Sequence, residues 1–81
     1  MQNLRNIETT DDFCLELHYA NGEVREFDMK PLLLLKPWTK INSLAYFKEA
    51  KIFYNTVVWP GEIDIAPETL YLDSKLISIQ N

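Results

Sequence analysis

One short stretch of the chain carries the residue types that most often take part in catalysis or metal binding. Cys14, Glu16 and His18 alternate with apolar residues, so a strand would place all three side chains on one face. Residues four apart on a strand are separated by about 13 Å, too far for Cys14 and His18 to bind one metal ion or to form a nucleophile–base pair. Only side chains from another strand could complete a site. We therefore predict no catalytic residue, no metal site and no cofactor.

A pair of acids is the second candidate for chemistry. Glu62 and Asp64 stand two apart in a strand-like stretch, which is the arrangement of paired catalytic carboxylates. Their alternation with Ile63 and Ile65 is also typical of a half-buried edge strand. We interpret Asp64 as structural, accepting backbone N–H bonds around the neighbouring turn or near the helix that follows. The alternative is a small-ligand sensing or regulatory domain with a shallow pocket lined by Trp59, Asp64 and Tyr71.

Basic and aromatic side chains are interleaved in the middle of the chain. Residues 30–51 contain five lysines against one acid, whereas residues 61–73 contain four acids and no base. Trp38 lies between Pro37 and Thr39, outside any periodic element, and is typical of an exposed interface anchor. The interface that we predict consists of Trp38, Lys40, Tyr46 and Phe47. The same pattern would suit single-stranded nucleic acid, but the net charge of −4 makes nucleic-acid binding the weaker alternative.

Length and composition limit the number of domains and the class of protein. A chain of 81 residues is enough for a single domain, residues 1–81, with a thin core. A hydrophobic fraction of 47% excludes disorder, and one cysteine excludes an intramolecular disulfide. The N-terminus lacks the apolar segment of a secretory signal, and the longest aliphatic run, 32–35, is far shorter than a membrane span. We therefore expect a cytoplasmic protein.

Hydrophobic periodicity predicts the elements that position these side chains. The strongest signal is a hairpin in which Asn21-Gly22 forms a type I′ turn between two strands. Strands are predicted at 4–9, 13–19, 23–29, 52–54 and 56–59. Short helices are predicted from Pro31, from an Asn42 or Ser43 cap through Ala50, and from Pro67. Residues 74–81 form a tail that docks as an additional strand or frays.

The order of these elements predicts the fold class. It is β-β-β-α-β-β with short helices, a two-layer α+β domain with a mostly antiparallel sheet. Such a sheet has open edges, which small proteins often cover by pairing with another chain.

Three motifs carry a resemblance to a known family. They are the hairpin at residues 19–25, the Leu44-x-x-Phe47 helix, and the segment Thr56–Tyr71 with its Trp59-Pro60-Gly61 turn. Over residues 3–73 the chain resembles the bacterial domain-of-unknown-function family 2442. Members usually carry Asn or Asp before the glycine of this turn, whereas here Pro60 precedes Gly61 directly.

The resemblance has implications for fold and function. It implies a small α+β fold without an established enzymatic activity. Some members carry an appended DNA-binding helix-turn-helix domain, and others are encoded beside a small partner protein in arrangements that look like toxin–antitoxin pairs. Together with the small size, the aromatic side chains and the open edges, this leads us to expect a non-enzymatic protein-interaction module. It would form a homodimer or bind a small partner from a neighbouring gene, as an antitoxin does.

Overall fold

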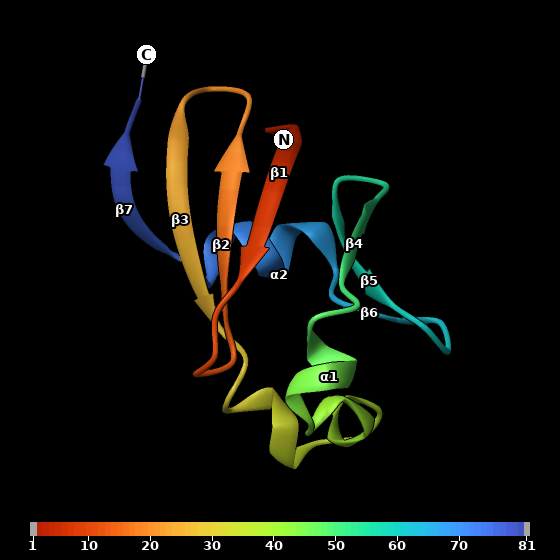
Figure 1. The fold of residues 1–81 in the computed structure, drawn as a ribbon. Coiled ribbons are helices and arrows are strands. Elements are labelled where there is room, and N and C mark those ends of the chain that lie inside the picture. Colours follow the sequence, from red (N-terminus) through yellow and green to blue (C-terminus); the bar gives the residue numbers. More distant parts are fainter. Residues whose placement is uncertain (1, 81) are drawn as a thin grey trace.

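The computed structural model describes residues 2–80 and divides the strands between two antiparallel sheets (Figure 1). The first sheet has the order β1-β2-β3-β7, with β1 (Leu4–Thr9), β2 (Cys14–Tyr19), β3 (Glu23–Asp28) and β7 (Lys75–Ile79). The second has the order β4-β5-β6, with β4 (Lys51–Phe53), β5 (Thr56–Trp59) and β6 (Ile63–Asp64). The α+β class with antiparallel strands is therefore confirmed, although the strands form two sheets.

Short helices connect the two sheets. Two 3-10 helices, η1 (Leu32–Leu34) and η2 (Trp38–Ile41), precede α1 (Leu44–Phe47), and α2 (Pro67–Leu72) leads from the second sheet back to β7. The Ser43 hydroxyl caps α1 by accepting the Tyr46 N–H at 3.2 Å, as expected for an N-cap serine. Pro67 begins α2, as predicted. The tail docks as β7 and extends the first sheet.

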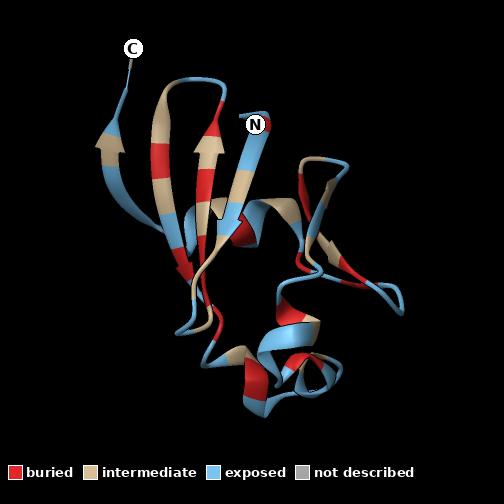
Figure 2. Ribbon diagram, in the orientation of Figure 1, coloured by how far each residue is buried: buried red, intermediate tan, exposed pale blue. Residues whose placement is uncertain are grey.

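The β2–β3 hairpin follows from its local sequence. Leu15 and Leu17 alternate with half-buried polar residues, so one face of β2 lies in the core (Figure 2). The turn is not type I′, because Gly22 alone of the Asn21-Gly22 pair has a positive φ, of 89°. The Gly22 N–H donates to the Tyr19 carbonyl at 3.0 Å, so Gly22 is the last residue of a four-residue turn that begins at Tyr19. The positive φ of Gly22 then leads the chain into β3.

Aromatic rings join the two sheets in one core. The Phe47 ring is tilted against Phe13 at 5.2 Å and stacked on Trp59 at 6.2 Å between ring centroids. The largest fully buried side chains come from both sheets, from the helices and from the residues just after β3 and β6: Trp59, Phe47, Leu15, Leu17, Met29, Ile41, Ile65, Leu70 and Val57. No helix among residues 2–80 has the length and apolarity needed to cross a membrane.

Several predicted boundaries are wrong, and one helix was not predicted. β2 begins at Cys14 rather than Phe13, and β3 ends at Asp28 rather than Met29. Trp38, expected outside any periodic element, begins η2. The helix at α1 ends at Phe47 rather than Ala50. The strand predicted at 52–54 ends at Phe53, because Tyr54 and Asn55 both adopt positive φ, of 50° and 61°, and form a tight hairpin turn.

Candidate functional site

Two of the predicted interface residues, Trp38 and Tyr46, link the helical segment to the second sheet. The Trp38 indole N–H donates to the Asp64 carbonyl oxygen at 2.9 Å, and the Tyr46 hydroxyl donates to the Pro60 carbonyl. Both rings are half-buried, and Lys40 is exposed. Trp38 and Tyr46 thus tie the helical segment to the turn between β5 and β6, so their polar atoms already have partners within the chain.

The interface assignment of Phe47 is wrong. Its side chain is fully buried against Phe13 and Trp59, because α1 turns this position toward the core. Lys48, another member of the basic and aromatic pattern, pairs with the carboxylate of Asp11. Four members of the pattern on which the nucleic-acid alternative depended, Trp38, Tyr46, Phe47 and Lys48, therefore make intramolecular contacts.

The three residues predicted to line one ligand pocket are not brought together. Trp59 is buried, and its indole N–H donates to the Phe47 carbonyl at 2.9 Å. Asp64 is exposed, and its backbone carbonyl, rather than its carboxylate, accepts a hydrogen bond from Trp38. Tyr71 packs on the other sheet, with its ring edge-on to Tyr19 at 5.0 Å. Trp59 and Asp64 lie on β5 and β6 of the second sheet, while Tyr71 packs α2 against the first sheet.

A polar cluster that sequence reasoning missed surrounds Tyr71. The Arg25 guanidinium lies 4.4 Å from the centre of the Tyr71 ring, and its Nε donates to the Ser74 hydroxyl at 2.6 Å. The Tyr71 hydroxyl and Arg25 both donate to the Glu23 carboxylate, at 2.7 and 2.9 Å. The Tyr71 hydrogen bond is the main cause that lowers the pKa of Glu23. The signal in the sequence was the spacing of Glu23 and Arg25, which places both on one face of β3.

Tyr19 lies beside this cluster with a buried hydroxyl. The oxygen has no hydrogen-bond partner among the described residues, and burial raises the pKa of Tyr19 to about 12. An unpaired buried hydroxyl costs about 1–3 kcal/mol of desolvation that no hydrogen bond offsets.

We therefore expect Tyr19→Phe to stabilise the domain by about 1 kcal/mol, measured by urea unfolding at constant m-value. The matched change Tyr71→Phe removes a satisfied hydroxyl and is expected to destabilise. A Tyr19→Phe variant that is less stable than wild type would contradict the assignment.

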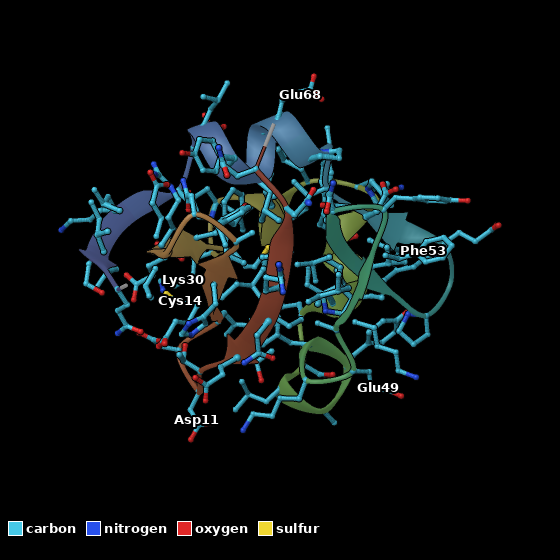
Figure 3. All side chains as sticks on the ribbon, turned by 90° about the horizontal axis from the view of Figure 1, so that it is seen from above. Asp11, Cys14, Lys30, Glu49, Phe53 and Glu68 are labelled. Carbon is cyan, nitrogen blue, oxygen red and sulfur yellow. The ribbon has the colours of Figure 1, made fainter. Side chains whose placement is uncertain are left out.

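A shallow groove of about 440 Å³ lies on the second sheet. It is lined by Glu49, Lys51, Ile52, Phe53, Val58, Trp59 and Pro60. Figure 3 shows Glu49 and Phe53 on the same side of the molecule. Phe53 and the neighbouring Tyr54 are both exposed, with ring centroids 4.3 Å apart. Of the three residues predicted to bind a ligand, Trp59 alone lines this groove.

The comparisons with known proteins identify the family. The family model described as protein of unknown function (DUF2442) matches residues 4–75. The chain belongs to this family. No curated protein and no solved structure matches it. The DUF2442 match begins at the first residue of β1 and ends at the first residue of β7. It therefore covers the second sheet, all the helices and strands β1 to β3 of the first sheet, and it leaves the rest of β7 outside.

The strand at which the DUF2442 match ends forms an open edge. In Figure 1, β7 lies at the outer edge of the first sheet, and β3 is its partner. Leu76, Ile77 and Ile79 are 44, 52 and 62% exposed, and Leu72 at the end of α2 is exposed as well. β7 therefore presents unpaired backbone groups and aliphatic side chains together.

Cys14 is a buried structural thiol in this DUF2442 domain. Burial raises its pKa, and the Lys30 ammonium lies 3.7 Å from its sulfur (Figure 3). A buried thiol with a raised pKa is a poor nucleophile. The distance argument made for Cys14 and His18 holds, because both lie on β2 four residues apart.

Proposed function

We propose that this DUF2442 protein is a non-enzymatic protein-interaction module that binds another polypeptide chain by pairing a strand with β7. The observation that carries the proposal is the exposed aliphatic edge of β7. An open edge offers backbone N–H and C=O groups to another strand, and apolar side chains beside them add area to bury.

The two edges of the first sheet differ in a way that supports this choice. On β1, Arg5, Asn6 and Glu8 are exposed, and charged side chains protect an edge against pairing. The chain also covers the start of β1, where the Leu4 N–H donates to the Asn55 side chain at 3.4 Å. On β7, the only charged residue is Lys75 at its start.

A bulge interrupts β7 without closing its edge. The register against β3 shifts between Val24 and Arg25, which face Ser78 and Leu76, so Ile77 is the additional residue. Bulges can turn an edge away from partners. Here the aliphatic side chains on both sides of the bulge stay exposed, so it bends the strand but leaves it accessible.

The partner that we propose is a second copy of the chain or a small protein encoded beside it. Support for the second comes from the resemblance to family members in toxin–antitoxin-like arrangements. An antitoxin-like role would consist of occluding or stabilising that partner along β7. The concentration of lysines at 30–51 and of acids at 61–73 would help to orient an incoming chain.

The experiment compares charge substitutions at β7 with one far from it. We expect the wild-type chain to form a dimer in light scattering or to recover a stoichiometric partner from lysate of its native host. Ile77→Lys with Ile79→Lys should abolish the association, since two ammonium groups would have to be buried in the new pair. The control is Leu34→Lys, because Leu34 is 81% exposed on η1.

Circular dichroism establishes that each variant is folded before association is compared. A wild-type monomer with no stoichiometric partner would overturn the proposal. The proposal would also be overturned if the Ile77→Lys and Ile79→Lys variant associated as strongly as wild type.

A further inference from the structure

The outer face of the first sheet gathers metal-ligating side chains from two strands. Glu8 lies on β1, and Glu16 and His18 lie on β2. One ligand atom from each residue lies within 4.8 Å of the other two. The His18 Nε2 atom is 2.8 Å from the Glu16 carboxylate and 3.7 Å from that of Glu8. Glu8 thus supplies from the neighbouring strand the ligand that the spacing within β2 does not provide.

The strand register gives a second, independent observation. Glu16 stands directly opposite Glu8 on one side and directly opposite Glu26 on the other, so three carboxylates form a row across β1, β2 and β3. Like charges directly opposite one another destabilise a sheet. The register is held by Leu15 and Leu17, whose burial would be lost if β2 slipped by one residue. On the far side of the row, Lys75 of β7 stands directly opposite Glu26 and offsets that carboxylate. The core therefore forces Glu8 and Glu16 together with no lysine or arginine opposite either of them, and a bound cation there would relieve the repulsion.

We propose that Glu8, Glu16 and His18 form a binding site for a first-row divalent transition-metal ion, with Zn²⁺ as the probe. Two carboxylates and an imidazole are a mixed oxygen and nitrogen donor set, which suits Zn²⁺ better than Mg²⁺ or Ca²⁺. This proposal goes beyond the interaction module, because it concerns the outer face of β1 and β2 rather than the edge of β7. It also concerns a metal ion rather than a polypeptide.

The separations between the ligand atoms are close to those of a zinc site. Zn²⁺ binds nitrogen and oxygen ligands at about 2.0–2.2 Å, so ligand atoms in a tetrahedral site are about 3.3 Å apart. The separations between His18 Nε2 and the two carboxylates, 2.8 and 3.7 Å, lie on either side of that value. The hydrogen bond between His18 and Glu16 would be replaced by the two bonds to the metal.

The site is open to solvent. The side chains of Glu8, Glu16 and His18 are 65, 42 and 28% exposed, which leaves an entry path and room for water as the remaining ligand. The pairing of β1 with β2 holds the two strands that carry these side chains in a fixed register.

The test is isothermal titration of the tag-free full chain with ZnCl2, with MgCl2 as the comparison ion. We expect one Zn²⁺ per chain and much weaker Mg²⁺ binding. Glu8→Gln and His18→Gln should each weaken Zn²⁺ binding at least about tenfold, since even loss of a group supporting a ligand costs 10–100-fold. Glu26→Gln is the matched control, because it removes one carboxylate of the same row without removing a ligand.

A second measurement separates binding from folding defects. Zn²⁺ should raise the melting temperature of wild type and of Glu26→Gln, because a ligand of the native state stabilises it. Absence of Zn²⁺ binding to wild type would overturn the proposal. Equal losses of Zn²⁺ affinity in Glu8→Gln and Glu26→Gln would also overturn it, since they would show that Zn²⁺ is attracted to the negative charge of the sheet in general and not bound by specific ligands. Equal binding of Mg²⁺ would exclude a role for the imidazole.

Discussion

Phe47→Ala is expected to destabilise the domain by about 3–5 kcal/mol, the usual cost of truncating a buried aromatic side chain. The ring is fully buried and contacts Phe13 and Trp59, so its loss leaves a cavity where the helices meet the second sheet. Because small domains have thin cores, a loss of this size approaches their whole free energy of unfolding. Urea unfolding followed by circular dichroism measures the change.

The control for this prediction is Leu44→Ala on the same helix. Leu44 is exposed, so its truncation should change the free energy of unfolding by about 0.5 kcal/mol or less. The pair separates a core role for Phe47 from the interface role that its sequence position indicated. If Phe47 were an interface residue, the Phe47→Ala variant would lose association while keeping wild-type stability. That result would contradict the core assignment.

Gly22→Ala is expected to destabilise the domain by roughly 2–4 kcal/mol, combining backbone strain with loss of a hydrogen bond. Gly22 has a φ of 89°, and a Cβ atom at this position would lie 2.1 Å from the backbone oxygen of Gln80. The Gly22 carbonyl also accepts the Gln80 N–H at 2.7 Å. A side chain at the hairpin turn must therefore push away Gln80, the residue that follows β7. Loss of amide hydrogen-exchange protection at Gln80 would report this displacement directly.

Gly61→Ala provides the matched control. Gly61 has a similar φ of 91°, but its added Cβ would meet the hydroxyl of Tyr46 at 3.1 Å, at the far end of a side chain that can move. It should therefore cost only the left-handed strain, about 1–2 kcal/mol, and leave β7 protected. Equal changes in the free energy of unfolding for the two substitutions would show that the close approach of Gln80 to Gly22 does not contribute to the cost of Gly22→Ala.

The elements that the sequence predicted correctly are those with local causes. The alternation of Leu15 and Leu17 defines β2, because a period of two leaves one face buried whatever lies beyond it. The Ser43 cap and the Pro67 start of α2 depend on groups within one helical turn. The family resemblance was confirmed for the same reason, since its motifs are continuous segments.

The errors at the candidate sites concern residues whose partners are distant in the chain. Trp38 has the sequence context of an exposed anchor, yet it donates a hydrogen bond to Asp64, 26 residues later. Phe47 and Leu44 share one helix, and only the packing of α1 against Trp59 determines which of them is buried. Tyr71 and Asp64 separated because the strands formed two sheets rather than one.

By itself, the sequence determined most of the strands, the starts of α1 and α2, and the face that Cys14, Glu16 and His18 share, because these follow from backbone periodicity and local hydrogen bonding. Only the tertiary structure decided what those faces meet. Register brought Glu8 beside Glu16 and His18, and docking of β7 placed an aliphatic strand at the open edge. The physical reason is that pairing between distant strands depends on burial summed over the whole core, which no local pattern specifies.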